Sequence, residues 1–241
     1  MKNFNVVPST TESVEDGKEK LKEKIREILN FPIYRTVEKP NIEIDTRKFF
    51  DTNPSEEEIK RFFEQNYYLE KGDKHSLAQL CLLIIGEQQA YDGDFIFEDY
   101  VAVREFVNLV ESLGILVHVQ NSIELLLGRI GAHIFFARSQ EDLKKMKSLI
   151  LDEITDYDAY HKEYGRLMGF PETAIKAFVG ESERFSSPED SLINKDKFPQ
   201  DTNLPNTYGH FVYSKDHADE EHAYFIERNR KLKEYASELF E

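Results

Sequence analysis

The chain of 241 residues has one cysteine, no tryptophan and no long hydrophobic run. A single thiol, Cys81, cannot form an internal disulfide, and it cannot supply a cysteine-based zinc site. Its neighbours are leucine and isoleucine, so we expect Cys81 to be buried and unreactive. The apolar run from Leu80 to Ile85 is far shorter than the roughly 20 residues of a membrane-spanning helix. The sequence therefore predicts neither a disulfide framework nor a membrane partner.

The N-terminal segment lacks the pattern of a secretory signal. Residues 1–17 contain Ser, Thr, Glu and Asp where a signal peptide has a basic start and an apolar stretch. We therefore expect a cytoplasmic protein in which residues 1–12 form a flexible tail.

Basic charge is also scarce, with 31 Lys and Arg against 46 Asp and Glu and a formal net charge of -15. Proteins that bind nucleic acid gain much of their affinity by neutralising phosphates, and they usually carry a basic stripe. The lysine clusters at 18–24 and 144–147 are interleaved with or flanked by acids, as in solvated helix faces. The acidic balance argues against a nucleic-acid partner. The abundance of Glu and Lys is typical of thermophilic proteins.

Apolar periodicity divides the rest of the chain into helices and strands, and 18 Phe and 12 Tyr suffice for a sizeable core. Ser55 and Ser139 are predicted helix caps, each with an acidic residue three positions later. Residues 31–51 are predicted to be irregular, and Tyr-Asp-Gly-Asp at 91–94 has the composition of a turn. The predicted helices are 14–28, 55–67, 75–90, 97–113, 121–127, 139–151 and 218–239, and the predicted strands are 115–119 and 132–137.

This order of elements predicts a helix-rich α/β or α+β fold, with a small sheet of few strands flanked by helices. We expect a helical N-terminal lobe at 13–92 and an α/β lobe at 93–241. The second lobe includes a long loop at 186–208, which has three prolines and little periodicity, and the C-terminal helix at 218–239.

The most unusual stretch of the chain runs from residue 157 to residue 178. On a helix, Tyr157, Tyr160, His161, Tyr164 and Met168 share one face, and a Gly-Phe-Pro corner then ends the helix. Tyrosine and histidine combine an apolar body with a polar tip, so they suit a wall that is half packed and half wet. One interpretation is a pocket wall, and the other is an aromatic core face whose hydroxyls are hydrogen-bonded.

On the first interpretation, this stretch supplies the candidate site residues. His161 would donate or accept a proton near neutral pH, beside Tyr164. Arg166 would hold an anionic group if the turn at Gly165 swings it inward. We take these three as candidate catalytic residues, and Tyr157 and Tyr160 as candidate ligand-binding residues.

The wording Tyr-His-x-x-Tyr-Gly-Arg-Leu-Met-Gly-Phe-Pro-Glu, followed by residues 174–178, resembles an archaeal family of uncharacterised proteins, domain of unknown function family 483. The resemblance covers this stretch closely and residues 115–151 loosely. Members of the family often carry a Cys-Cys pair after the Pro-Glu, whereas this chain has Thr173 and Ala174. The resemblance implies an uncharacterised soluble protein, and it transfers neither an activity nor a metal or redox role.

Two further histidines, His118 and His133, lie in the two predicted strands. If the strands are neighbours, both side chains can point to one face, but a metal site would need a further ligand. A lone histidine in a strand is more often a satisfied core residue. The carboxylates in and after the predicted turn lack the spacing of a calcium loop, and we interpret them as part of a capped turn; they are Asp92, Asp94, Glu98 and Asp99.

The C-terminal segment gathers histidines and acids: His210, His217, Asp219, Glu220, Glu221 and His222. His217 and His222 are about 140° apart on a helix, so they do not converge as an HExxH pair does. His217 and Glu221 do share a face. These residues leave a metal-dependent hydrolase open as a hypothesis, although we assign no metal ligand.

A short segment, Gly128-Arg129-Ile130-Gly131, resembles the Gly-x-x-Gly loop of KH-type RNA-binding modules. Ile130 is poorly suited to a loop that faces phosphates, and the residues after it have the pattern of a strand. The alternative is that the two glycines turn a short helix into a strand.

Three functional hypotheses therefore remain open. The first is a small-molecule-binding protein or enzyme with a Tyr/His-lined pocket, the second a non-catalytic protein that self-associates, and the third a metal-dependent hydrolase. Signatures of nucleotide, dinucleotide, serine hydrolase and kinase sites do not occur in the sequence. Which cofactor, if any, the protein binds is left unknown by the sequence.

Overall fold

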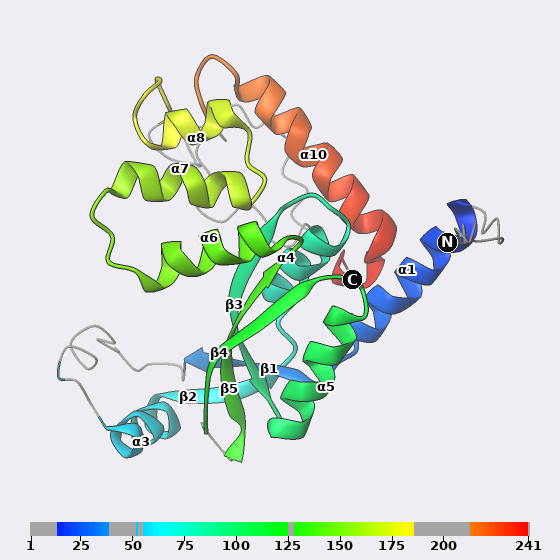
Figure 1. Cartoon of the computed structure of the whole chain (residues 1–241), viewed down its shortest axis with the longest axis vertical. Coiled ribbons are helices and arrows are strands. Elements are labelled where there is room, and N and C mark those ends of the chain that lie inside the picture. The colour runs from blue at the N-terminus through cyan, green and yellow to red at the C-terminus, as the bar shows by residue number, and fades with distance from the viewer. Residues whose placement is uncertain (1–13, 39–51, 53–54, 125–127, 186–212, 241) are drawn as a thin grey trace, which may run out of the picture.

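The computed structural model describes residues 14–38, 52, 55–124, 128–185 and 213–240 (Figure 1). Five antiparallel strands form one sheet in the order β2-β1-β3-β5-β4. The strands are β1 (Ile33–Glu38), β2 (Tyr67–Lys71), β3 (Ala90–Phe97), β4 (Leu116–Glu124) and β5 (Ile130–Ala137). This helix-rich arrangement confirms the predicted fold class, and the antiparallel pairing makes it α+β.

Eight α-helices and one 3₁₀ helix of the described chain accompany the sheet. They are α1 (Val14–Leu29), α3 (Glu56–Asn66), α4 (Lys74–Ile84), α5 (Tyr100–Glu111), α6 (Gln140–Leu151), α7 (Tyr157–Leu167), α8 (Glu172–Phe178), α10 (Ala218–Tyr235) and η2 (Ser237–Phe240). Figure 1 shows α6, α7 and α8 together at one end of the molecule, and α3 beside β2 at the other. Among the described helices, none has the length and apolarity needed to cross a membrane.

The starts of two helices follow the predicted capping chemistry. Ser55 N donates to Glu58 Oε2 at 2.8 Å, and Glu58 N donates back to Ser55 Oγ at 3.4 Å. Asp142 N donates to Ser139 Oγ at 3.1 Å. Each serine satisfies a backbone N–H that has no partner within its helix, which fixes where α3 and α6 begin.

The hydrophobic core extends over both faces of the sheet, and an aromatic cluster of the core lies on one of them. Phe106 of α5 contacts Phe95, Phe97 and Phe136, with ring centroids 5.4, 5.3 and 6.5 Å away. These strand residues share a face because side chains alternate along a strand. Cys81 of α4 is fully buried in the same core, and burial raises the pKa of its thiol to about 12, as expected of an unreactive residue.

The opposite face of the sheet carries the polar residues of the central strands. Asp92 pairs with Phe135, and Asp94 pairs with His133, so these four side chains point away from the Phe95 and Phe97 face. Helix α6 contacts β3, β5 and α7. Burial and the charge of Asp92 raise the pKa of the Tyr164 hydroxyl, so this residue of α7 lies near the second face of the sheet.

The prediction of a turn at residues 91–94 is wrong. These residues belong to β3, which pairs with β5 along its whole length. A Cβ on Gly93 would lie 2.6 Å from the Tyr91 hydroxyl, because the tyrosine ring crosses the strand at this point. The glycine therefore meets a packing requirement within a strand and does not mark a turn.

Parts of the other strands were also predicted wrongly, as irregular chain or as helix. The irregular segment 31–51 contains β1, while residues 39–51 lie outside the described part of the chain. Tyr67 and Ala90, predicted at helix ends, begin β2 and β3, and Phe97 ends β3. Residues 121–124, predicted as a short helix, continue β4 through a bulge. In each case, pairing with a distant segment overrides the local pattern.

The C-terminal helix lies where it was predicted, as α10 and η2, and its predicted inward residues are buried. They are Phe225, Leu232, Ala236 and Leu239. The core combines residues from both predicted lobes, for example Ile25 and Phe136, in a single cluster. The predicted tail at 1–12, the loop at 186–208 and residues 125–127 lie outside the described residues.

Candidate functional site

The α7–α8 corner, residues 164–172, is held by close backbone packing. Gly169 has a φ of 74°, and a Cβ there would lie 2.2 Å from the carbonyl oxygen of Glu87. A Cβ on Gly165 would lie 2.9 Å from Ile175 Cγ1. Both positions need glycine because atoms of nearby segments of the same chain approach so closely. The glycines of this unusual sequence therefore have a structural explanation.

Hydrogen bonds attach the α7–α8 corner to the rest of the fold. Gln89 N, just before β3, donates to Leu167 O at 2.8 Å, and Arg138 N donates to Gln89 O at 3.0 Å. The hydroxyl of Tyr224 in α10 donates to Gly169 O at 2.6 Å. The end of α7 is thus connected to the sheet and to the C-terminal helix.

His161 lies in an aromatic cluster between α7 and α8. Its ring is 4.9 Å from Phe178, 5.0 Å from Tyr160 and 6.4 Å from Tyr157, measured between centroids. Tyr157, at the start of the helix, is 66% exposed. His161 is therefore packed by rings on several sides, and Tyr157 lies at the edge of this packing.

Tyr160 and Tyr164 stack on each other and lead toward the sheet. Their ring centroids are 5.9 Å apart, with an angle of 17° between the planes. Burial raises the pKa of both hydroxyls, and the nearby charge of Asp92 raises them further. Among the residues of the predicted helix face, Tyr160 and Tyr164 are therefore the ones that lie near the carboxylate of Asp92 in β3.

Arg166 points to a different side of α7. Its guanidinium donates to both carboxylate oxygens of Glu172, with the shorter contact at 2.8 Å, and lies 3.6 Å from Glu163. The structure therefore does not bring Arg166 together with His161 and Tyr164. Instead, Arg166 links the end of α7 to the start of α8 on the outer surface.

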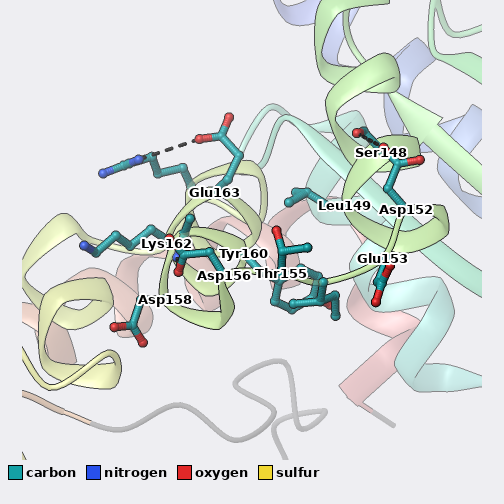
Figure 2. Close-up of a pocket in the computed structure, with 13 residues that line it drawn as sticks. Ser148, Leu149, Asp152, Glu153, Thr155, Asp156, Asp158, Tyr160, Lys162 and Glu163 are labelled. Carbon is teal, nitrogen blue, oxygen red and sulfur yellow. Dashed lines mark hydrogen bonds and ion pairs between the residues drawn. The ribbon is translucent and has the colours of Figure 1, made fainter.

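A concavity of about 790 Å³ lies between α6 and α7 (Figure 2). It is lined by the end of α6, by the connection at 152–156 and by one side of α7. Figure 2 shows Leu149 on the α6 side of this space, and Tyr160 and Glu163 on α7. Among the predicted site residues, the lining includes Tyr160 and Arg166 and excludes His161.

The lining of the concavity has more acidic than basic groups. The acids are Asp152, Glu153, Asp156, Asp158 and Glu163, and the bases are Lys162 and Arg166, which leaves an excess of three negative charges. Lys162 pairs with Glu181, and Arg166 pairs with Glu172, so both bases are already engaged. Glu153 and Asp158 have no hydrogen bond or ion pair within the part of the chain that is described.

A second polar group, the acid–histidine cluster of Asp92, His133 and Asp94, lies on the polar face of the sheet. His133 Nδ1 is 2.8 Å from Asp94 Oδ1, and His133 Nε2 is 3.7 Å from Asp92 Oδ2. The side chains of Asp92 and His133 are 14% and 20% exposed, whereas that of Asp94 is 86% exposed. One imidazole is thus held between two carboxylates of the neighbouring strand.

The pKa shifts of the acid–histidine cluster follow from these contacts. The hydrogen bond to Asp94 raises the pKa of His133, while burial acts in the opposite direction. Burial raises the pKa of Asp92, and His133 and the Tyr164 hydroxyl act to lower it. Asp92 Oδ1 and His133 Nε2 are buried, and neither has a hydrogen-bond partner among the described residues.

Sequence reasoning missed the acid–histidine cluster because Asp92 and Asp94 were placed in a turn. The available signal was the placement of Asp92 and Asp94 at alternate positions between Tyr91 and Phe95, which is typical of a strand. The two strands with histidines are neighbours, as the histidine hypothesis required, and the Phe135 ring contacts both histidine rings. Its centroid is 4.8 Å from His133 and 6.2 Å from His118.

The C-terminal histidines do not converge. His217 Nδ1 is 3.2 Å from Glu220 Oε2, and His222 Nδ1 is 3.3 Å from the Tyr213 hydroxyl. Glu221 is buried and accepts hydrogen bonds from Ser214 N and Oγ. His210 lies outside the described residues, and within them no three His, Cys, Asp or Glu side chains are placed to hold a metal ion.

Comparison with known proteins adds no relative from which a function could be transferred. The chain matches no family model, no curated protein and no solved structure. The functional conclusion therefore depends on the geometry of the concavity and of the acid–histidine cluster.

Proposed function

We propose that the protein binds a small organic cation in the concavity between α6 and α7. The observation that carries this proposal is the combination of Tyr160 with an excess of carboxylates in one lining. The volume of about 790 Å³ lies within the range of small-molecule sites, roughly 300–1,000 Å³.

The chemistry of the lining favours an amine or guanidine over an anion. An aromatic ring attracts a cation over its face by about 0.5–1 kcal/mol at an exposed site. The unpaired carboxylates of Glu153 and Asp158 add attraction that solvent partly screens. Arg166 would be needed for an anion, but it is already held by Glu172 and Glu163. The apolar side chains of Leu149 and Ile154 would cover the hydrocarbon part of the ligand.

Titration with spermidine by isothermal calorimetry tests this function. We expect a dissociation constant of about 1 mM or tighter, and no binding of succinate, an anion of similar size. Tyr160→Leu should weaken spermidine binding by about two- to fivefold, the equivalent of one cation–π contact. Tyr157→Leu is the matched control, because this exposed tyrosine of the same helix is not part of the lining.

A second pair of variants separates the site from general attraction to an acidic protein. Glu153→Gln with Asp158→Asn removes two charges from the lining, whereas Glu105→Gln with Asp216→Asn removes two exposed charges elsewhere. Only the first pair should weaken binding by more than twofold. Equal losses in both pairs, or equal binding by Tyr160→Leu and the original chain, would refute the site.

Self-association is a second candidate function, and one observation favours it. Leu151, Ile154 and Tyr157 are exposed large apolar residues that lie on or next to the connection between α6 and α7. Apolar side chains that gather on a surface often mark a protein contact. Sedimentation velocity over a concentration series would detect a dimer, and Leu151→Ser with Tyr157→Ser should abolish it. A purely monomeric chain at millimolar concentration would exclude this candidate.

A further inference from the structure

The acid–histidine cluster has the geometry of a proton-binding site. Neutral imidazole has one N–H, which can donate to Asp94 while leaving Nε2 as an acceptor 3.7 Å from the Asp92 carboxylate. Imidazolium has two N–H groups, so it can donate toward both acids. Because His133 Nε2 is buried without a hydrogen-bond partner in the described chain and lies 3.7 Å from Asp92 Oδ2, an ion-pair distance, the protonated form fits this position better.

The same geometry is poorly arranged for catalysis. A catalytic imidazole presents one ring nitrogen to the substrate and is oriented through the other by a carboxylate, which is often buried. In the acid–histidine cluster, Nε2 is the buried nitrogen, and the carboxylate that contacts Nδ1, Asp94, is 86% exposed. The exposed and buried sides are thus reversed, and proton binding is the better-supported role.

The charged groups nearest to His133 are acidic. Strand β3 contributes Asp92 and Asp94, and these are the charges that act on the imidazole. Strand β4 contributes His118, on the far side of Phe135. Helix α7 contributes the two neutral tyrosines of the stacked pair, Tyr164 and Tyr160, which feel the charge of Asp92. The α6 residues packed toward the core are apolar: Leu143, Met146, Leu149 and Ile150.

A continuous set of contacts connects the acid–histidine cluster with the concavity. His133 faces Asp92. Burial raises the pKa of the Asp92 carboxyl, and the Tyr164 hydroxyl acts to lower it. Tyr164 stacks on Tyr160, and Tyr160 lines the concavity. When His133 loses its proton, Asp92 loses its positive partner, and the net charge of the three side chains falls from -1 to -2. The tyrosine pair lies between this change of charge and the ligand position.

We propose that His133, held between Asp92 and Asp94, is a proton switch that regulates the α6–α7 concavity through Tyr164 and Tyr160. This role depends on the proposed ligand site. Loss of the proton increases the negative potential behind the tyrosines, so a cationic ligand binds more tightly as the pH rises. By linkage, the bound cation makes His133 lose its proton more readily. The expected change in affinity is about two- to tenfold, the size of effect of one unit charge that solvent partly screens.

Nuclear magnetic resonance on the ligand-free protein tests the switch without any ligand. Labelled imidazole nitrogens should show His133 titrating above the ordinary value of about 6.5. Asp94→Asn, an exposed change that leaves the core intact, should lower that midpoint. Tyr160 and Tyr164 ring signals should shift with the same midpoint, and His133→Asn should abolish the shift. An ordinary His133 midpoint, or tyrosine signals that do not follow it, overturns the switch.

Spermidine affinity measured from pH 5.5 to pH 7.5, where the ligand keeps all of its positive charges, tests the regulation. The original chain should bind two- to tenfold more tightly at the upper end, and His133→Asn should bind with an affinity that is independent of pH. The matched control is His118→Asn, which should keep the pH dependence of the original chain. A pH-independent affinity in the original chain overturns the regulation. If spermidine does not bind at all while the tyrosine signals follow His133, the ligand proposal fails and the coupled proton site stands.

Discussion

The α7–α8 corner and the acid–histidine cluster use polar and unusual residues in opposite ways. At the corner, the unusual residues are fully engaged in contacts within the fold: Gly169 lies against the Glu87 carbonyl, and Arg166 is held by Glu172. In the cluster, His133 Nε2 is buried and has no hydrogen-bond partner within the described chain. A group whose interactions are complete supports the fold, whereas an incompletely satisfied buried group is free to respond to a proton or a ligand. The difference separates residues that serve packing from the buried groups on which the proposed proton switch depends.

The largest expected effect comes from the closest backbone approach of the α7–α8 corner. Gly169→Ala places a Cβ 2.2 Å from the Glu87 carbonyl oxygen in a residue with a φ of 74°. Left-handed backbone alone costs a non-glycine residue about 1–2 kcal/mol, and the backbone clash adds to it. We expect a loss of about 3 kcal/mol in the free energy of unfolding, measured by urea denaturation.

Gly180→Ala is the matched control for this change. Gly180 has a φ of 82°, but a Cβ there meets nothing within 4 Å. Its substitution should cost about 1 kcal/mol, from backbone strain alone. Equal losses at the two glycines would mean that the corner is not closely packed, and the contrast with the acid–histidine cluster would be lost.

A smaller effect is expected at the glycine next to the acid–histidine cluster. A Cβ on Gly93 would lie 2.6 Å from the Tyr91 hydroxyl, which is the far end of a side chain and can move. We expect Gly93→Ala to cost about 1 kcal/mol, well below the cost of Gly169→Ala. In a Tyr91→Leu background the cost should fall, because the crossing ring is gone. A double-mutant cycle without coupling would contradict this origin of the glycine.

Local sequence patterns were sufficient for elements whose ends carry their own capping residues. Ser55 and Ser139 start helices as predicted, because a cap is decided by residues three positions apart. They were insufficient for β3, since Tyr-Asp-Gly-Asp has a turn composition and becomes a strand only by pairing with β5. The β1 strand likewise depends on β2 and β3. Strand pairing is non-local, so the sequence alone does not decide it.

The candidate site was predictable only in part for the same reason. The helical face with Tyr160 and Tyr164 could be read from spacing, and Tyr160 does line the concavity. The carboxylates that pair with His133 could not, because their strand register brings together residues 39 positions apart. The two glycines of the α7–α8 corner drew attention to a site, although they are explained by contacts with Ile175 and Glu87 that no local pattern contains.

A pH profile of stability gives a direct test of the acid–histidine cluster. Because the hydrogen bond to Asp94 raises the pKa of His133, the folded protein holds this proton more tightly than the unfolded chain. The stability gained is fully present below the unfolded pKa of about 6.5, and it is lost as the pH rises through the higher folded pKa. We expect His133→Asn to remove about 0.2–1 kcal/mol at pH 6 and less at pH 9, by thermal unfolding.

The control for the pH profile is the other histidine on the same face. His118→Asn should leave the pH dependence of stability intact, because its ring is separated from the acids by Phe135. If the difference between His133→Asn and the original chain is the same at pH 6 and pH 9, the imidazole holds no proton that depends on the fold. The polar face of the sheet would then resemble the α7–α8 corner, with its groups used for structure alone.

The smallest expected effect concerns His161, and it tests whether the aromatic cluster between α7 and α8, next to the corner, has any chemistry of its own. Phenylalanine can keep the ring contacts that His161 makes with Phe178 and Tyr160 but cannot exchange a proton. We therefore expect His161→Phe to change the free energy of unfolding by less than about 0.5 kcal/mol and to leave spermidine affinity unchanged. His161→Ala removes the packing and should cost about 1 kcal/mol. If His161→Phe kept full stability yet lost more than fivefold in affinity, the imidazole itself would act on the ligand, and this aromatic cluster would belong to a site whose lining does not include His161.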